Sequence, residues 1–422
     1  MAGPLRSFLD LSAAHPFPLH NLPFSAGIPL GQASPRCVSR LGDFIIDLGA
    51  MEQRGLFADI LQEQVFGRET LNVYMAKGRG IWRAVRARLQ ALFSAENATI
   101  RDNEDLKKAV LSPVSDFKYS MPVNIPNYTD FYASKNHAYN VGVMFRGPEN
   151  ALQPNWTRLP VGYHGRASSV RLSGTPVIRP KGQVKPPDAP DSLYRPCSRL
   201  DFELEVGFFV GGPGNELGHP MTVAEAKEAI FGCVLLNDWS ARDIQNWEYV
   251  PLGPFTSKNF ITTISPWIVT LEALEPFKVP LPPQEPEPLE YLRDMELGAY
   301  DVKLKVKLRT GEMEEGAVIS ESNLKYLYWS FGQQLAHHTV SGCNMLPGDL
   351  LGTGTISGTT PQSLGCLLEM SQNGKQSLTL PNGQTRTFLQ DGDELTLEGE
   401  CLGEGYVVGF GQCSSVVRPA LP

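Results

Sequence analysis

The chain has 422 residues, of which 42% are hydrophobic, and its 37 Lys and Arg against 45 Asp and Glu give a net charge of −8. This length allows a large core in two or three domains, and the acidic balance argues against nucleic acid or an anionic membrane as the main partner. With 40 Gly and 34 Pro, the composition is typical of a turn-rich β protein that binds a small molecule, rather than of a helical bundle.

The seven cysteines form no C-x-x-C pair, so they are expected to be reduced and mostly buried. The sequence shows neither the basic, apolar leader of a signal peptide nor an apolar run of about eighteen residues that would span a membrane. We therefore expect a cytoplasmic protein.

The first elements predict a small N-terminal domain. Alternating residues on both sides of Gly42-Asp43 predict a hairpin over 37–48. A helical stripe follows, and its arginines, including Arg83 and Arg86, are expected to form a solvated face; the stripe consists of Ile81, Trp82, Val85, Leu89, Leu92 and Phe93. A short helix over 102–111 and a polar linker over 111–121 place the boundary between domains 1–118 and 119–422.

The rest of the chain is expected to be mainly β with some α. Short segments with β character cover 168–178, 200–210, 300–308, 349–356, 394–399 and 406–411. Thr222 and Glu225 form a capping box that opens a helix reaching Ile230. Another helix is predicted from the stripe Leu324, Leu327, Tyr328, Phe331 and Leu335, and the proline-rich stretch 274–288 reads as a connecting loop.

The segment 200–210 carries the clearest pattern. Apolar residues alternate with Asp201, Glu203 and Glu205, so a strand would place these three carboxylates on one face. Neighbours on one face of a strand lie about 6.5–7 Å apart, close enough for two carboxylates to bind one cation. The alternative is an acidic strand face turned to solvent, as antiparallel sheets often have.

Two further carboxylates, Asp130 and Asp238, stand near other residues that could carry chemistry. Asp130 lies seven residues before His137, and Asp238 follows the apolar run 231–236, where side chains of a solvated turn are the alternative. If all four converge, each pair repels by roughly 4 kcal/mol at 4 Å and an effective dielectric near 20, so a cation is required. Ligation by oxygen alone favours Ca²⁺ or Mg²⁺ over zinc.

Other catalytic chemistries lack their motifs. The sequence contains no H-E-x-x-H, no G-x-S-x-G elbow, no phosphate-binding loop and no G-x-G-x-x-G after a strand. His137, between two tyrosines and near Asp130, is the best candidate for a general base.

Motifs over nearly the whole chain resemble those of the fumarylacetoacetate hydrolase family, of the fumarylacetoacetase type. They include Tyr-Thr-Asp-Phe-Tyr at 128–132, Gly-Tyr-His-Gly-Arg at 162–166, Glu-Leu-Glu at 203–205, Asn-Asp-Trp-Ser-Ala-Arg-Asp-Ile-Gln at 237–245, Trp-Glu-Tyr-Val-Pro-Leu-Gly-Pro-Phe at 247–255 and Gly-Thr-Ile-Ser-Gly at 354–358. The Glu-x-Glu and the later Asp are common to the wider superfamily, whereas the full-length set is much more specific.

This resemblance implies an N-terminal SH3-like β-barrel, a C-terminal mixed β-roll and a homodimer. It places Ca²⁺ or Mg²⁺ ligands at Asp130, Glu203, Glu205 and Asp238, with Lys258 and Thr262 beside the cation. The implied base is His137, oriented by Glu369, with Arg242, Gln245 and Lys258 around the reacting carbonyl. The implied substrate-binding residues are Tyr132, Arg146, Tyr163, Gln245, Tyr249 and Thr355.

The activity that the resemblance implies is hydrolysis of the carbon–carbon bond of fumarylacetoacetate, a small diketo acid, to fumarate and acetoacetate at the end of tyrosine and phenylalanine breakdown. Acylpyruvate hydrolysis and oxaloacetate decarboxylation by the same superfamily are alternatives, as is an inactive metal-binding scaffold. The N-terminal domain argues against the first two, and intact positions His137, Glu369 and Lys258 argue against the third.

Overall fold

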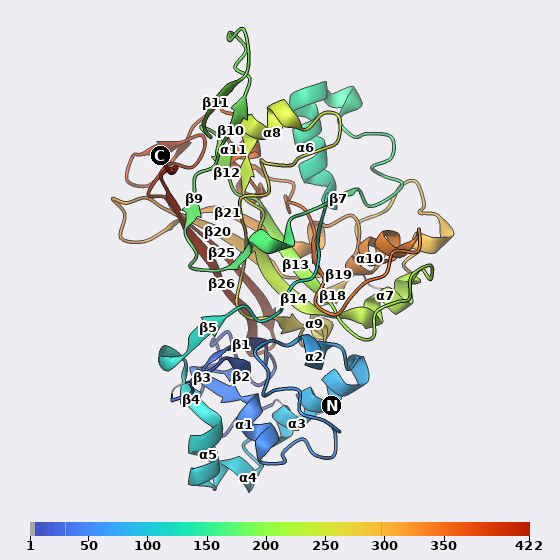
Figure 1. Ribbon diagram of the computed structural model, residues 1–422, viewed down its shortest axis with the longest axis vertical. Helices are drawn as coiled ribbons and strands as arrows, with labels where there is room; N and C mark the ends of the chain where they lie inside the picture. Colours follow the sequence, from blue (N-terminus) through green and yellow to red (C-terminus); the bar gives the residue numbers. More distant parts are fainter. Residues whose placement is uncertain (1–4, 30, 297) are drawn as a thin grey trace.

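The structure, a computed structural model, describes residues 5–29, 31–296 and 298–422. An N-terminal group of elements lies below the larger C-terminal sheets in Figure 1. Within the described residues, no helix combines the length and apolar character needed to cross a membrane.

The N-terminal sheet has the strand order β4-β3-β2-β1-β5. Its strands are β1 (Phe24–Ile28), β2 (Arg36–Leu41), β3 (Phe44–Asp47), β4 (Leu111–Pro113) and β5 (Lys118–Ser120). The hairpin prediction is confirmed, because Leu41 pairs with Phe44 across a turn in which Gly42 has a φ of 60°. The predicted linker over 111–121 is wrong, since β4 pairs with β3 and β5 pairs with β1.

Short helices cover this sheet: α1 (Leu48–Gln53), α2 (Asn72–Met75), α3 (Arg79–Leu92), α4 (Ala98–Arg101) and α5 (Glu104–Val110). Helix α3 confirms the predicted apolar stripe. The expected solvated face is wrong at Arg86, which is buried and donates to the backbone oxygens of His20 and Asn21. The segment around residue 20 covers this position, which helical periodicity within α3 does not reveal.

A mixed sheet forms the centre of the C-terminal part, in the order β7-β6-β22-β13-β14-β16-β8, with β17 paired to β14. The strands are β6 (Tyr128–Phe131), β7 (Gly162–His164), β8 (Val170–Leu172), β13 (Leu204–Val210), β14 (Ile230–Asn237), β16 (Thr262–Ile264), β17 (Val269–Thr270) and β22 (Leu350–Gly352). Phe209 and Phe231 pack into the N-terminal core, whereas Phe208 and Leu235 pack into the other core. Burial on both faces explains the uninterrupted apolar sequence of β14.

A second sheet, in the order β21-β20-β25-β26-β9, packs beside the first. Its strands are β9 (Val177–Ile178), β20 (Lys303–Arg309), β21 (Ala317–Asn323), β25 (Glu394–Gly403) and β26 (Tyr406–Arg418). Smaller pairs are β10 (Lys181–Val184) with β11 (Leu193–Pro196), β12 (Leu200–Asp201) with β15 (Ser240–Ala241), β18 (Lys278–Val279) with β19 (Ala299–Tyr300), and β23 (Leu378–Thr379) with β24 (Thr385–Arg386).

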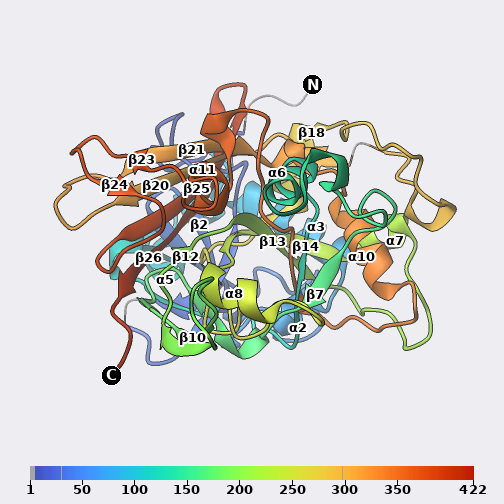
Figure 2. The same cartoon turned by 90° about the horizontal axis from the view of Figure 1, so that it is seen from above.

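The C-terminal helices are α6 (Lys135–Arg146), α7 (Val223–Ala229), α8 (Arg242–Glu248), α9 (Leu271–Leu274), α10 (Phe331–Thr339) and α11 (Leu367–Met370). The capping box of α7 is confirmed. The helix predicted from Leu324 begins only at Phe331. Ser330 is its N-cap: the Ser330 hydroxyl accepts from the backbone N–H of Gln333, and the Gln333 side chain accepts from the backbone N–H of Ser330. Helices α6, α8 and α11 gather at one end of the molecule (Figures 1 and 2).

Single turns of 3₁₀ helix connect many of these elements: η1 (Val114–Asp116), η2 (Pro148–Asn150), η3 (Ala167–Ser169), η4 (Glu275–Phe277), η5 (Glu290–Leu292), η6 (Leu324–Tyr326) and η7 (Pro361–Ser363). The predicted loop over 274–288 contains η4 and β18 and is irregular only in its later part.

Candidate active site and metal centre

Four carboxylates meet at one end of the central sheet. Asp130 lies in β6 and Glu205 in β13, Glu203 directly precedes β13, and Asp238 directly follows β14. Because β13 and β14 are antiparallel, with Leu204 paired to Asn237, the start of one strand lies beside the end of the other. One oxygen from each carboxylate lies within 4.8 Å of the others, and all four residues are buried.

Gly352 in β22 makes room for this convergence. Strand β22 lies between β6 and β13, and Gly352 pairs with Asp130 on one side and Gly207 on the other. A Cβ at this position would stand 2.5 Å from Asp130 Oδ1 and 3.0 Å from Glu205 Oε2. Any other residue would therefore push the two carboxylates apart.

Asp201 does not join the cluster, so the prediction of three carboxylates on one strand face is wrong. The strand is interrupted at residues 202–203, and β12 pairs with β15 instead of continuing into β13. Asp201 is buried and accepts a hydrogen bond from Arg242 Nε at 2.9 Å. The solvated alternative is also wrong for Glu203 and Glu205, which are 6% and 0% exposed.

A lysine and two hydroxyl groups line the same cluster. Lys258 Nζ contacts Glu203 Oε2 and lies 2.6 Å from Asp238 Oδ2. Tyr163 donates to Asp238 Oδ2 at 2.8 Å, and Thr262 donates to Asp238 Oδ1 at 3.3 Å. The residues that the sequence associates with the cation thus lie together, with Lys258 as a counter-charge rather than a ligand, because an ammonium group has no lone pair to offer.

The cluster is short of positive charge. Burial, and then the charge of Asp238, raise the pKa of Asp130 well above its ordinary value. Burial, and then the charges of Asp130 and Asp238, do the same to the pKa of Glu205. Burial also raises the pKa of Asp238, although Lys258 opposes this. Burial acts in the same direction on Glu203, but Lys258 and Arg242 outweigh it and lower the pKa of Glu203 to about 2.

The donor set fits a hard divalent cation. Among the described residues, Glu205 Oε1 is buried without a hydrogen-bond partner, an arrangement that costs free energy unless another group compensates it. A cation between the four carboxylates would supply that compensation and relieve their repulsion. Oxygen is the only ligand atom in this set, which disfavours zinc.

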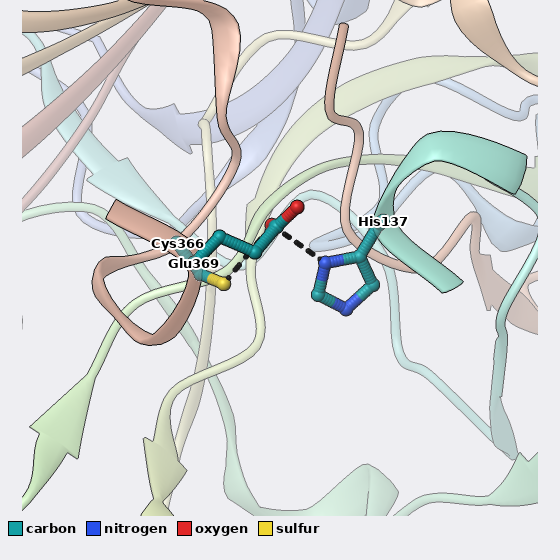
Figure 3. A group of neighbouring side chains, drawn as sticks. All are labelled: His137, Cys366 and Glu369. Atoms are coloured by element: carbon teal, nitrogen blue, oxygen red, sulfur yellow. Dashed lines mark hydrogen bonds and ion pairs between the residues drawn. The ribbon is translucent and has the colours of Figure 1, made fainter. Parts of the chain in front are cut away.

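Next to this cluster, His137 from α6 and Glu369 from α11 form a buried pair (Figure 3). His137 Nδ1 lies 2.7 Å from Glu369 Oε2. The pKa of Glu369 is lowered because, although burial raises it, His137 and the hydrogen bonds from Asn140 and Ser357 favour the anion. An anionic carboxylate only accepts hydrogen bonds, so Nδ1 donates and Nε2 is left as the basic nitrogen.

Cys366 completes a group of three that resembles a metal site in spacing alone. Its thiol donates to Glu369 Oε2 at 3.2 Å, and burial followed by the charge of Glu369 raises the pKa of Cys366 well above its ordinary value. A protonated thiol is a poor metal ligand. The group therefore acts as a hydrogen-bonded histidine and carboxylate pair.

Arg242 lies at the edge of the carboxylate cluster. Its guanidinium lies 2.9 Å from Glu203 Oε1 and donates to Gln245 Oε1 at 3.2 Å. Among the described residues, Arg242 Nη2 and the hydroxyl of buried Thr355 have no hydrogen-bond partner. The ring of Tyr132 packs edge-on against His137, with centroids 5.4 Å apart. These groups leave donors for a polar ligand between His137 and the cluster.

Arg146 and Tyr249 stand apart from this hydrogen-bonded set. Arg146 ends α6 and donates to the backbone oxygens of Asn150 and Ala151 at 3.0 and 2.6 Å. Tyr249 follows α8 and is 48% exposed. Their expected roles in substrate binding stay predictions.

Four residues of the site, Asn140, Ser357, Cys366 and Gly352, were not predicted as site residues from the sequence. Asn140 lies three residues after His137 in α6, so helical spacing offered a signal for it. Cys366 lies three residues before Glu369, and Ser357 lies within the motif at 354–358, so both stood close to positions that the resemblance marks. Their contact with the side of the site that carries His137 bridges a sequence separation of more than 200 residues, which no local pattern reveals.

Comparisons with known proteins agree with this arrangement. Residues 20–122 match the family described as Fumarylacetoacetase N-terminal, and residues 127–418 match Fumarylacetoacetate (FAA) hydrolase C-terminal. The fumarylacetoacetase of Bos taurus is 51% identical over 418 residues, covering 98% of this chain and 99% of its own. The fumarylacetoacetase of Arabidopsis thaliana is 50% identical over 420 residues, covering 99% of both chains.

A solved structure supports the fold. The fumarylacetoacetate hydrolase from Exiguobacterium antarcticum superposes with a TM-score of 0.52 at 17% identity, over 94% of this chain and 99% of that chain.

The human fumarylacetoacetase is 50% identical over 418 residues, covering 98% of this chain and 99% of its own. From the two family matches and these relatives, the chain belongs to the fumarylacetoacetate hydrolase family.

Proposed function

We propose that this chain hydrolyses the carbon–carbon bond of fumarylacetoacetate to fumarate and acetoacetate, the last step of tyrosine and phenylalanine breakdown. The observation that carries the proposal is the buried pair of His137 and Glu369 beside the four-carboxylate cluster, in a chain about half identical to fumarylacetoacetases over its full length. A base next to a cation site is what hydrolysis of a diketone requires.

His137 is the general base of the proposed reaction. Its Nδ1 is held by Glu369 at 2.7 Å, so Nε2 takes a proton from water, which then attacks the carbonyl carbon. The new carbon–oxygen bond converts the carbonyl into an oxyanion. When the oxyanion collapses, the carbon–carbon bond breaks and the first product leaves as a carboxylic acid. The electron pair of the broken bond goes to the second fragment as an enolate, which takes the proton from His137 to become acetoacetate and returns the histidine to its neutral form.

Arg242, Gln245 and Lys258 stabilise the oxyanion. Arg242 binds the carbonyl oxygen of the Gln245 side chain at 3.2 Å, which leaves the amide N–H groups of Gln245 as donors. Losing one such donor typically lowers the rate about 10²- to 10³-fold. Asp130, Glu203, Glu205 and Asp238 would hold Ca²⁺ or Mg²⁺, with Lys258 and Thr262 beside it, and the cation would supply Lewis-acid stabilisation of negative charge on the substrate.

Substrate recognition uses both cationic and phenolic groups. Arg146, with a planar guanidinium, is suited to a substrate carboxylate, and Tyr132 and Tyr249 offer hydroxyl donors. Tyr163 donates its proton to Asp238, so its hydroxyl oxygen is available to the substrate as an acceptor. The buried, unpartnered hydroxyl of Thr355 supports a role in binding substrate, within the residues that the structure describes.

We extend the proposal to the domain folds, the oligomeric state and the location of the protein. We assign residues 1–118 to an SH3-like N-terminal domain and residues 119–422 to the catalytic β-roll, and we expect a homodimer that works in the cytoplasm. The covering of the central sheet by the N-terminal core supports a fixed arrangement of the two parts.

Consumption of fumarylacetoacetate by the purified protein tests the proposal, first alone, then with a chelator, and then with Ca²⁺ or Mg²⁺ restored. We expect fumarate and acetoacetate to form in a chelator-sensitive way, and His137→Ala to abolish turnover while cation affinity stays the same. Near-normal turnover in His137→Ala would exclude the assigned base. If a folded protein with either ion cleaves no fumarylacetoacetate, acylpyruvates and oxaloacetate become the substrates to test, and an inactive scaffold is the remaining alternative.

A further inference from the structure

Glu369 lies at the centre of a closed set of hydrogen-bond donors that extends beyond His137. Oε2 accepts from His137 Nδ1 at 2.7 Å, from Ser357 Oγ at 2.7 Å and from the thiol of Cys366 at 3.2 Å. Oε1 accepts from Asn140 Nδ2 at 2.8 Å. Figure 3 shows the histidine and the thiol approaching the carboxylate from different sides.

All of these partners donate. An ionised carboxylate accepts on both oxygens, whereas a protonated one must donate from one of them. If Oε1 carried the proton, its O–H would face the N–H donor of Asn140; if Oε2 carried it, the O–H would face the donors of Ser357 and Cys366. Glu369 is 5% exposed, so water offers little alternative. The arrangement is therefore matched to the anion and not to the acid.

The donors are themselves held in place. Ser357 Oγ accepts from the backbone N–H of Gly365 at 2.9 Å, so its own proton is directed to Glu369. The backbone oxygen of Ser357 accepts from Asn136 Nδ2 at 3.0 Å. Asn140 lies one turn after His137 on α6, and both bind the same carboxylate on α11. Glu369 thus joins α6, α11 and the segment after β22.

We propose that Ser357 and Asn140 are positioning residues for the reaction. Their hydrogen bonds hold Glu369 as an oriented anion, and Glu369 in turn fixes the tautomer and direction of the His137 ring. This inference rests on the proposed role of His137 as the base, and it assigns Ser357 and Asn140 a role that acts through Glu369.

The chemistry gives the proposal a distinctive signature. Each hydrogen bond withdraws charge from the carboxylate, so removing one makes Glu369 more basic. A more basic carboxylate stabilises the protonated form of His137 more strongly, and the enzyme then loses its neutral base at a higher pH. In the pH profile of kcat/KM, the acid limb therefore moves to higher pH, and kcat falls as well. Among the described residues, the charges of Asp201, Glu203 and Arg242 also act on this set through Cys366, and Arg146 acts on Tyr132, whose ring packs against His137.

Ser357→Ala and Asn140→Asp test the proposal in the full-length protein. We expect Ser357→Ala to lower kcat roughly 10-fold, the scale of one hydrogen bond to a charged group, and to move the acid limb up by about one pH unit. Asn140→Asp replaces a donor with a second anion beside Glu369, so it is expected to move the limb further in the same direction. If Ser357→Ala does not fold, Asn140→Asp carries the test.

Ser320→Ala is the matched control. Ser320 is buried, and its hydroxyl donates to the backbone oxygen of Leu364 at 2.7 Å rather than to Glu369. We expect this variant to unfold more easily but to keep the acid limb of the unmodified protein. In the Glu369→Gln variant, adding Ser357→Ala should lower kcat much less than it does in the unmodified protein. The reason is that Glu369→Gln already removes the carboxylate anion to which Ser357 donates.

The outcomes separate this inference from the proposed function. If His137→Ala keeps near-normal turnover, the base assignment fails and the inference fails with it. If His137→Ala is inactive while Ser357→Ala and Asn140→Asp both keep the acid limb of Ser320→Ala, only the positioning role is overturned. Additive losses of kcat in the Glu369→Gln background would also overturn it.

Discussion

Asp201 accepts a hydrogen bond from Arg242 Nε at 2.9 Å, and both side chains are buried. The same carboxylate accepts from the backbone N–H groups of Leu367 and Leu368 at 2.7 and 2.9 Å, at the start of the helix that carries Glu369. Arg242 reaches Glu203 on its other side, also at 2.9 Å. Asp201 therefore ties Arg242 both to the start of α11, which carries Glu369, and to the edge of the four-carboxylate cluster.

Replacing Asp201 with Asn is expected to lower the free energy of unfolding by about 3 kcal/mol, because breaking a buried ion pair leaves a poorly compensated charge. Urea unfolding measures this. Asp391→Asn is the matched control, since Asp391 pairs with Arg179 at 2.7 Å but is 41% exposed, and its loss is expected to stay under about 1 kcal/mol. Equal losses in the two variants would show that Asp201 contributes no more than a surface ion pair.

Gly142 allows α6, which carries His137, to pack closely against the segment around Ala151. A Cβ at Gly142 would stand 1.8 Å from the backbone oxygen of Ala151. We expect Gly142→Ala to cost about 1–3 kcal/mol of unfolding free energy through overpacking and to lower kcat by displacing His137. Gly80 in α3 has open space around it, so Gly80→Ala should be neutral or stabilising by up to about 1 kcal/mol. Thermal unfolding and turnover of both variants check this, and an undisturbed Gly142→Ala would contradict it.

Local chemistry made much of the fold predictable. The Gly42 turn, the apolar stripe of α3 and the capping box of α7 each depend on residues within a few positions of one another, and the structure confirms them. Arg86 could not be predicted in the same way, because the groups that bury it come from a distant segment. The interruption of the strand at 202–203 was equally hidden, since a period of two continues through it.

The candidate site was predictable in its residue types but not in its geometry. The Glu-x-Glu pattern and Asp238 pointed to a hard cation, and the structure brings these residues together with Asp130. Nothing in the sequence alone, however, indicated that Gly352 leaves the space between two carboxylates. The donors around Glu369 lie on three separate segments, so only the folded chain reveals them.

Acid should weaken the folded state partly through Glu369. Its pKa is lowered in the folded protein, so below the ordinary glutamate pKa of about 4.3 the unfolded state binds the proton more readily than the folded state does. The stability that Glu369 contributes is full above that value and is lost as the pH falls through the lower, folded pKa. The Glu369→Gln variant cannot lose stability in this way, because a glutamine side chain does not bind a proton in this pH range. The difference in unfolding free energy between the unmodified protein and Glu369→Gln should therefore narrow from about pH 5 to pH 3, and a constant difference would contradict the assignment.

Glu205→Gln tests the metal centre without relying on catalysis. It removes one of four mutually repelling carboxylates, so the chelated variant should be at least as stable as the chelated unmodified protein. With the cation present the order should reverse, because the variant loses a ligand and binds Ca²⁺ or Mg²⁺ at least about 10-fold more weakly. For the unmodified protein, a cation at 100 times its Kd adds about 2.7 kcal/mol.

Calorimetry measures the affinity of this variant, and thermal unfolding with and without chelator measures its stability. Asp349→Asn is the control, because Asp349 is a buried carboxylate that accepts from Asn127 and the backbone of Leu346 outside the cluster. It should lose stability by the same amount with and without cation and keep its cation affinity. If instead Glu205→Gln binds the cation as tightly as the unmodified protein, the four carboxylates do not form the metal centre, and their convergence must be balanced by Lys258 and shared protons alone.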